Sequence, residues 1–335
     1  MPITRKLLFE ECSAVAFYGF RPSAKGAEAF YRAMVEWFNQ LGYPPTTAGV
    51  GGAGFGSGMG SFRRASAKLE KRGFRKVRSF ELEATLPDDP GSDRRDYYVS
   101  AAYDADRDGQ YVDMIARSSL ATLSATSLLP IARAVALNLK PDYGIGFTRR
   151  YEWTPEFYVM GMNTEYYARG DFHPAAVDDD EAGRIAEWSL TGMPDQVYRD
   201  GVLRDVYPWN FLTRPQLRRR IGKVSLERWI QQDARRGTLG AFAGDMFLWE
   251  VRQRNIPGVR KVLRQAGAIL ESSEEEDDDE CTWTPEESLA WVVGGTPPED
   301  MIIFDGTGKE VPTEDVKKIV QRGRKKLGKK GPGKQ

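Results

Sequence analysis

Glycines recur at short intervals between residues 49 and 60, and this segment is the best match in the chain to a phosphate-binding pattern. Gly49-Val-Gly-Gly-Ala-Gly54 fits G-x-G-x-x-G. Glycines let backbone amides approach a phosphate closely, and the N-terminus of a following helix favours an anion. We expect that helix to begin at Ser61. The candidate ligand-binding residues are Gly49, Gly51, Gly54, Ser61, Arg63 and Arg64.

The surroundings of this segment differ from those of a dinucleotide-binding fold. The segment follows a predicted helix and Pro44-Pro45, where a Rossmann fold has a buried strand, and no P-loop lysine ends it. The sequence therefore favours a loop that connects two elements, and a phosphate site is the alternative.

Residue types that commonly perform catalysis are scarce. The chain has one histidine, His173, and two cysteines, Cys12 and Cys281. A disulfide scaffold, a zinc site built on a C-x-x-C pair and a two-histidine metal motif are therefore excluded. His173 has no recognisable nucleophile near it in sequence, so a structural histidine is favoured over a triad. We predict no catalytic residue, no metal ligand and no cofactor, and enzyme activity stays an open alternative.

Three aspartates alternate from Asp104 to Asp108, as at the start of a calcium loop. An EF-hand loop needs a glutamate at its twelfth position, but Ile115 stands there. Because predicted strands flank the aspartates, a hairpin turn explains them better than a metal site.

Aromatic and basic residues near position 210 form the candidate partner-binding surface. Aromatic residues combined with arginine are typical of interface anchors, although large aromatic side chains are more often buried in a core. The basic residues are also compatible with nucleic-acid phosphates, but a solvated face is the simpler interpretation. The candidate partner-binding residues are Tyr207, Trp209, Arg218 and Arg219.

The balance of charge conceals two charged blocks near the end of the chain. Lysine plus arginine and aspartate plus glutamate each total 48. Residues Glu271 to Glu280 include eight acids, whereas Lys317 to Lys334 include nine basic residues and no acid. Blocks of like charge repel themselves and stay solvated. No apolar run is long enough for a transmembrane helix or a secretory signal, so the expected location is the cytoplasm, with no membrane partner.

The periodicity predicts an α+β fold. Apolar residues at helical spacing predict a helix over 24–41. Alternating β-prone runs joined by turn residues predict antiparallel strands, and the expected arrangement is a mixed, largely antiparallel sheet covered by helices on one face. The predicted strands include 13–21, 77–86, 97–103, 110–116 and 143–153.

The pattern partly restarts after residue 153, which predicts two related α+β subdomains. The acidic block then acts as a linker, and the basic end is disordered. The predicted divisions are 1–153, 154–271, the acidic linker 272–283, a small helical and strand appendage 284–323, and the disordered basic tail 324–335.

The stretch Arg204-Asp-Val-Tyr-Pro-Trp-Asn-Phe-Leu212 resembles a block in uncharacterised bacterial proteins, many from planctomycete-like genomes. Residues 226–230, 236–239, Trp249 and 259–267 continue the block. The resemblance covers about residues 140–271 and implies a shared domain, with no activity to transfer. The overall layout also resembles α+β immunity proteins of bacterial toxin systems.

These observations lead to one main functional hypothesis and two alternatives. The main hypothesis is a non-catalytic, protein-binding component of a bacterial conflict or antiviral defence system that is immunity-like or senses a partner. One alternative is an enzyme or sensor that binds a nucleotide or another phosphate ligand at Gly49–Gly60. The other is a nucleic-acid-associated regulator that acts through the basic tail. The oligomeric state and the identity of the partner stay open.

Overall fold

The computed structural model divides the chain into two compact units, Met1–Ser272 and Ser273–Gln335. In the second unit, the described strands β15 (Ile303–Phe304) and β16 (Glu310–Val311) pair antiparallel. The predicted linker and tail, and most of the predicted appendage, lie outside the described residues. The structure describes residues 10–55, 58–85, 97–105, 110–161, 166–168, 171–173, 181, 183–185, 188, 195–270, 303–304 and 310–311.

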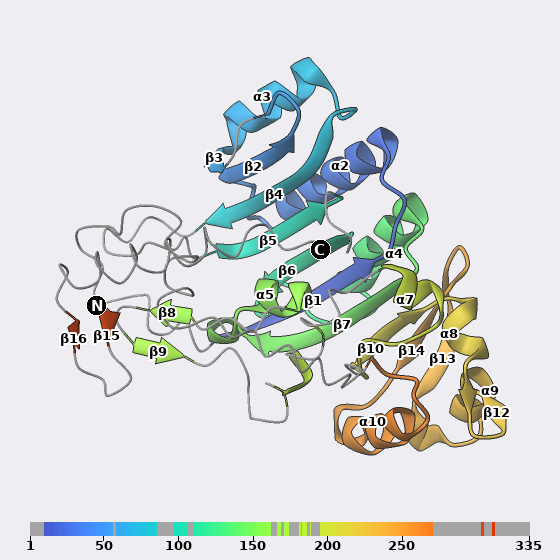
Figure 1. Cartoon of the computed structure of the whole chain (residues 1–335). Helices are drawn as coiled ribbons and strands as arrows, with labels where there is room; N and C mark the ends of the chain where they lie inside the picture. Colours follow the sequence, from blue (N-terminus) through green and yellow to red (C-terminus); the bar gives the residue numbers. More distant parts are fainter. Residues whose placement is uncertain are drawn as a thin grey trace, which may run out of the picture. The chain divides into compact units, whose positions relative to one another are not determined.

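One large sheet dominates the first unit (Figure 1). Its described strands follow the order β13-β14-β10-β7-β1-β6-β5-β4-β2-β3, and every neighbouring pair is antiparallel. The predicted α+β class is thereby confirmed. The strands are β1 (Glu11–Tyr18), β2 (Thr47–Gly52), β3 (Met59–Ser61), β4 (Val77–Thr85), β5 (Tyr97–Asp104), β6 (Tyr111–Arg117), β7 (Tyr143–Arg150), β10 (Trp209–Leu212), β13 (Thr238–Ala243) and β14 (Met246–Glu250).

Two short strand pairs and several helices complete the described part of this unit. The pairs are β8 (Tyr166–Ala168) with β9 (Asp171–His173), and β11 (Arg220–Ile221) with β12 (Val224–Ser225). None of the described helices is long and apolar enough to cross a membrane. The α-helices are α2 (Ala24–Gln40), α3 (Phe62–Arg72), α4 (Leu128–Leu139), α5 (Pro155–Met160), α7 (Asp195–Arg199), α8 (Arg214–Arg218), α9 (Leu226–Gln231) and α10 (Ile256–Gln265).

Strand β1 lies between β6 and β7 and is buried on both faces. Successive side chains of a strand point to opposite faces. Ala14, Ala16 and Tyr18 accordingly join one hydrophobic cluster, whereas Val15 and Phe17 join the other. A strand buried on both faces reads as a continuous apolar run, as this one does.

Helices cover both faces of the sheet, so the prediction of helices on one face is wrong. On the Phe17 face, Phe30 of α2 and Leu128 of α4 are buried. On the Tyr18 face, Val159 of α5 and Leu263 of α10 are buried. The two-sided burial of β1 requires a second layer of this kind, because each apolar face must be shielded from water.

The predicted boundary at residue 153 falls within the first unit. Strand β7 precedes that boundary and β10 follows it, and Trp209 of β10 pairs with Gly146 of β7. The two predicted subdomains therefore contribute to one continuous sheet. Their relation by duplication stays a prediction.

Candidate functional site

The glycine segment contributes to β2 and β3, the last two strands in the order of the sheet. Gly49 and Gly51 belong to β2 and pair with Glu81 and Ser79 of β4. Strand β3 pairs with the other edge of β2, and α3 begins directly after β3. The interpretation as a connecting loop is therefore wrong for residues 49–52. Glycine has low strand propensity, so a segment this rich in glycine did not predict a strand.

Close approach of atoms on a neighbouring strand or turn explains two of these glycines. A Cβ at Gly51 would collide with the Ser79 hydroxyl, and one at Gly52 would collide with the carbonyl of Lys76. Gly52 also has φ 129°, which L residues with a side chain rarely adopt. Strand pairing accounts for glycine at both positions without a phosphate ligand.

An acidic groove of about 850 Å³ opens between the strands β2, β4, β5 and β6 and the helix α5. Gly49 and Gly51 line it, yet no lysine or arginine occurs among its described lining residues. A phosphate would meet carboxylates here, and like charges repel. The lining carboxylates are Glu81, Glu83, Asp104, Asp113 and Glu156.

Asp113 of β6 is the most deeply buried of these acids. Its exposed fraction is 2%, and Oδ1 accepts a hydrogen bond from the Ala102 amide at 3.0 Å. Burial, together with the nearby Glu81 carboxylate, raises the pKa of Asp113 to about 8, although the hydrogen bond from the Ala102 amide lowers it. At neutral pH the side chain is therefore mostly protonated and can donate a hydrogen bond into the groove.

The other predicted ligand residues lie on the opposite side of β2 or at the turn. Ser61 and Arg64 line a separate pocket of about 200 Å³ that also includes Lys68 of α3. Arg63 is exposed, and the carbonyl of Gly54 accepts a hydrogen bond from Arg72. The predicted set is therefore not brought together at one site, and a phosphate site near α3 stays a prediction.

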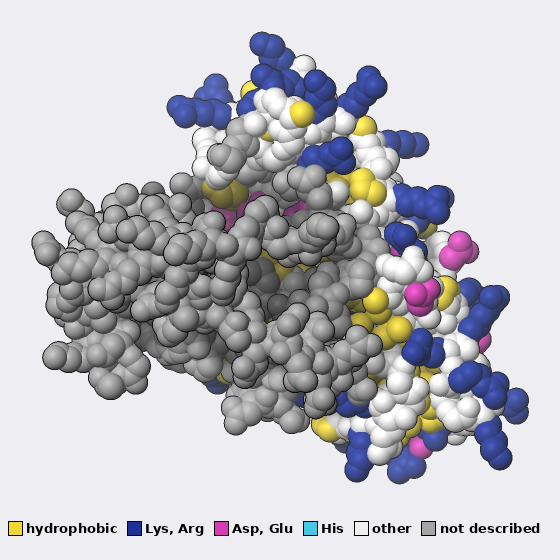
Figure 2. All heavy atoms as spheres, viewed as in Figure 1, with side chains coloured by type: hydrophobic (Ala, Val, Ile, Leu, Met, Phe, Trp, Pro, Cys, Tyr) yellow, Lys and Arg dark blue, Asp and Glu magenta, His cyan; other side chains and the backbone are white. Residues whose placement is uncertain are grey.

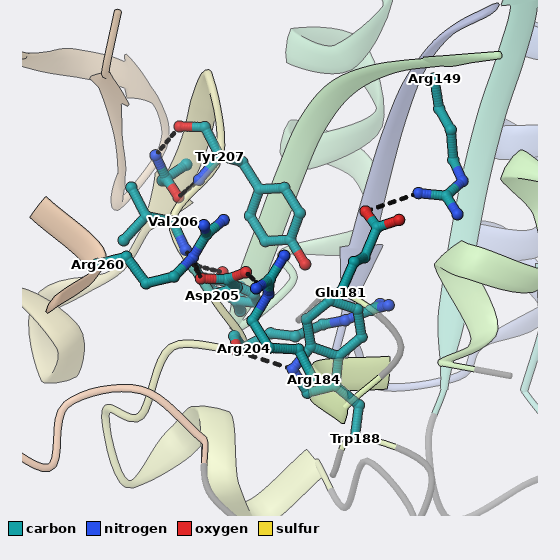
Figure 3. A network of polar contacts seen from close by, with 11 residues as sticks. Arg149, Glu181, Arg184, Trp188, Arg204, Asp205, Val206, Tyr207 and Arg260 are labelled. Carbon is teal, nitrogen blue, oxygen red and sulfur yellow. Dashed lines mark hydrogen bonds and ion pairs between the residues drawn. The ribbon is translucent and has the colours of Figure 1, made fainter. Parts of the chain in front are cut away.

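The segment that carries the bacterial resemblance contains a fully buried arginine, Arg204 (Figure 3). Its Nη1 donates to the Tyr18 hydroxyl and to the Val159 carbonyl, both at 2.7 Å. Its Nη2 donates to the Tyr158 carbonyl, and the guanidinium carbon lies 4.1 Å from the centre of the Trp188 ring. Carbonyls, a phenol and an aromatic face thus replace the water lost on burial.

The neighbouring Asp205 joins two further arginines (Figure 3). Its Oδ1 accepts from Arg260 Nε at 2.6 Å, and its Oδ2 lies 3.3 Å from Arg184 Nε. A second ion pair links Arg149 and Glu181 at 2.8 Å. These residues come from β7, α10 and the segments between them, so their spacing in sequence gives no sign that they meet.

Two of the predicted partner-binding residues belong to the core. Tyr207 and Trp209 are 3% and 5% exposed. The turn between them is closed by Asn210, which accepts from the Tyr207 amide at 3.0 Å and donates to the Tyr207 carbonyl at 2.7 Å. Burial of large aromatic side chains is the ordinary outcome.

The other two predicted partner-binding residues lie near the surface. Arg219 is half-buried and donates to the Gly267 carbonyl. Arg218 is exposed and belongs to a group of cations on α8, the β11–β12 turn and α9, which we call the basic face (Figure 2). The basic face consists of Arg214, Arg218, Arg220, Lys223 and Arg228, all of them exposed.

The structure gives no metal centre among the residues it describes: no group of three histidine, cysteine, aspartate or glutamate side chains there could hold an ion. The backbone of His173 pairs with Tyr166 in the β8–β9 hairpin. Cys12 is buried in β1, and burial raises the pKa of its thiol to about 12, so it stays an inert thiol.

Comparison with known proteins identifies a similar fold. No protein-family model matches the chain, and no curated protein matches it. The solved structure of the Pseudomonas aeruginosa T6SS protein PA0821 aligns over 79% of this chain and 81% of its own, with a TM-score of 0.50 and 11% identity. The two chains share a fold. At this identity the likeness concerns the fold alone, and the resemblance of residues 140–271 to a bacterial family stays a prediction.

Proposed function

We propose that this chain is a non-catalytic, protein-binding component of a bacterial conflict system, of the immunity or partner-sensing kind. It contacts an acidic partner protein through the basic face. The observation that carries the proposal is the display of five exposed cations over short adjacent elements. One acid, Glu227, lies among them, 3.6 Å from Arg214.

The backbone under the basic face is held in place, which lowers the entropy cost of binding. Thr213 and Gln216 cap α8 reciprocally, and Gln216 Nε2 donates to the Tyr198 carbonyl at 2.6 Å. Leu217 and Leu226 anchor α8 and α9 in the core. The cations therefore project from a fixed frame.

An aromatic ring beside the cations supports a protein partner. Arg214 lies over the ring of Phe247, 4.4 Å from its centre, and that ring is half-buried. Arginine stacked on an aromatic ring is a frequent anchor of protein–protein interfaces. The fold shared with a T6SS protein is consistent with a role in bacterial conflict.

The test compares wild-type protein with a variant in which Arg214, Arg218, Arg220 and Lys223 are changed to Gln. Affinity capture from the native host should recover one dominant acidic protein, and calorimetry with the purified pair should show binding that weakens with salt. We expect the variant to lose at least tenfold in affinity. The matched control changes Arg63, Arg64, Lys68 and Lys71 of α3 to Gln and should retain the affinity.

Two results would contradict the proposal. One is the absence of any dominant partner at near-native expression. The other is equal affinity of the face variant and the α3 variant, because a general effect of net charge would then explain the binding. Recovery of nucleic acid in place of protein would support the regulator hypothesis instead.

The small pocket beside α3 favours the phosphate hypothesis as a second candidate. Arg64 and Lys68 supply two cations next to Ser61, and a helix N-terminus attracts anions. If a nucleotide binds there, saturating ligand should raise the thermal midpoint, and Arg64→Gln should remove that shift. No shift with any nucleotide would eliminate this candidate.

A further inference from the structure

A row of cations lies along the solvent side of α3, where Figure 2 shows Lys and Arg side chains gathered at the top of the view. Arg64, Lys68 and Arg72 follow one another at intervals of four residues, which places them on one side of the helix. Leu69, which is buried, anchors another side of α3. We call Arg63, Arg64, Lys68, Lys71 and Arg72 the α3 patch.

The protein does not neutralise the charges of the α3 patch. None of its cations forms an ion pair within the part of the chain that the structure describes, and the sequence of α3 contains one acid, Glu70. Arg75 and Lys76, which are exposed, follow the helix. Like charges three or four residues apart on a helix destabilise it. A bound polyanion would remove this repulsion.

The pocket of about 200 Å³ beside α3 adds an aromatic wall to these cations. Arg64 and Lys68 line it together with Phe55, Ala48 and Val50. The Phe55 ring is half-buried, and the Lys68 ammonium lies 5.3 Å from the centre of that ring. A small pocket that combines cations with an aromatic wall suits a flat, π-bonded ring that is attached to a phosphate.

Gly60 of β3 leaves one wall of this pocket open. It pairs with Ala48 of β2, and opposite residues of an antiparallel pair project from the same face. Because Ala48 lines the pocket, a Cβ at Gly60 would project to that side, where it would meet no protein atom within 4 Å. The φ of Gly60 is not positive. Neither packing nor backbone geometry therefore requires glycine here, whereas close approach of a ligand would explain it.

We propose that the α3 patch binds single-stranded nucleic acid. Successive phosphates of the strand contact Arg64, Lys68 and Arg72, and one base enters the pocket and stacks on Phe55. A basic surface that follows the backbone, combined with aromatic stacking of bases, is the general means by which proteins bind single strands. The proposal extends the phosphate hypothesis for this pocket and is independent of the basic face.

Other polyanions fit the α3 patch less well. A base that stays stacked in a duplex cannot enter a pocket. An acidic peptide would contact the cations but would leave the aromatic pocket empty. The exposed large apolar side chains of the described residues are Leu137 of α4 and Val262 of α10, so the α3 patch offers none that would insert into a membrane surface.

The experiment measures the fluorescence anisotropy of a labelled single-stranded oligo(dT), about 12 nucleotides long, during titration with the full-length protein. We expect saturable binding that weakens with salt, and weaker binding of a duplex of the same length. Unlabelled oligo(dT) should displace the probe more effectively than polyglutamate, because polyglutamate has no base to stack on Phe55.

The fourfold α3 variant and the fourfold basic-face variant proposed above remove the same number of positive charges. We expect the α3 variant to lose at least about tenfold in affinity for oligo(dT), and its plot of log affinity against log salt should be less steep by about 0.7 for each lost phosphate contact. The basic-face variant is the matched control and should bind oligo(dT) as the wild type does.

Gly60→Val is the decisive variant, because it fills the pocket without changing any charge. Valine favours strands, and its Cβ would meet no protein atom within 4 Å, so the thermal midpoint should stay the same or rise. The affinity for oligo(dT) should fall about fivefold or more, since the stacked base is excluded. Gly240→Val is the matched control: Gly240 lies in the edge strand β13 and is equally unobstructed, and the variant should keep the affinity of the wild type.

Four results would overturn the proposal. They are the absence of saturable oligo(dT) binding, full affinity in Gly60→Val or in the α3 variant, an equal loss of affinity in the basic-face variant, and equal displacement by polyglutamate, which would indicate an acidic protein as the partner. A mononucleotide that raises the thermal midpoint while oligo(dT) does not bind would also overturn it and would support the nucleotide candidate alone.

Discussion

Arg204 and Asp113 are both buried ionisable side chains of the first unit, but their surroundings shift their charge states in opposite directions: Arg204 stays charged, whereas Asp113 is mostly neutral at neutral pH. Arg204 has two carbonyls and a phenol as hydrogen-bond acceptors and a tryptophan face beside it. Asp113 has one backbone amide and a second acid nearby. Neither forms an ion pair with an opposite charge among the described residues.

The difference lies in how far the surroundings of each group offset the effect of its burial on its pKa. Burial lowers the pKa of Arg204, but the surrounding tyrosine oxygens, Tyr18 first, raise it by more, so the guanidinium stays charged. Burial raises the pKa of Asp113 to about 8, and a single amide cannot offset it. The Arg204 region is therefore a fixed structural centre, whereas the acidic groove responds to pH.

The largest expected effect comes from Arg204→Met. The substitution leaves the carbonyls of Tyr158 and Val159 and the Tyr18 hydroxyl without a donor in the core, at about 1–3 kcal/mol each. We expect the free energy of unfolding to fall by about 3 kcal/mol or more, as measured by urea denaturation. Arg204→Lys keeps the charge but loses the planar guanidinium group. Its free energy of unfolding should lie between those of the wild type and Arg204→Met. Wild-type stability of Arg204→Met would contradict the comparison.

Asp113→Asn should change the free energy of unfolding by a smaller amount, and it should raise it. The folded-state pKa of Asp113 is raised, so the native protein holds a proton that the unfolded chain releases, and stability falls as pH rises from about 4 to about 8. Asparagine keeps the Ala102 hydrogen bond without this loss. We expect the variant to be more stable by roughly 1–3 kcal/mol at the upper end of that range.

The same denaturation series near pH 4 supplies the control for Asp113. Both proteins carry a neutral side chain there, so their difference should shrink toward zero. An equal difference at all pH values would mean that packing, and not ionisation, separates the variants.

The smallest expected change in stability is at Gly51, which lines the acidic groove. Gly51→Ala places a methyl group against the Ser79 hydroxyl, which can rotate away, so we expect a loss of about 0.5–1 kcal/mol in urea denaturation. Ser79→Gly should restore most of that loss in the double variant, because the two positions face each other across β2 and β4. A loss that Ser79→Gly does not relieve would locate the conflict in the backbone.

Local periodicity predicted several elements of this fold. The spacing of Ala27, Phe30, Met34 and Phe38 predicted α2, whose buried face contains all four. The antiparallel pairing of β5 with β6 was predicted from the two β-prone runs that precede and follow a turn-rich stretch of sequence. These patterns repeat over a few residues, and a single element contains the whole signal.

Contacts between distant segments could not be predicted from the sequence. Long stretches of sequence separate Arg184, Asp205 and Arg260, and only the fold brings them together. The resemblance drew attention to the segment 204–212, but it gave no sign that Arg204 and Asn210 are buried. The cavity lined by Arg149, Arg184 and Arg260 was missed for the same reason: these residues come from three separate parts of the chain.

The central position of β1 has a consequence for the order of folding during synthesis. Residues 11–18 are synthesised before both of their partners in the sheet, residues 111–117 and 143–150. The strand has no neighbour until about 100 further residues have been made, a large sequence separation of the kind that slows folding. Until then, both edges of an apolar strand stay open to other chains. A nascent chain that stalls before β7 should therefore depend most strongly on a chaperone that binds extended apolar segments.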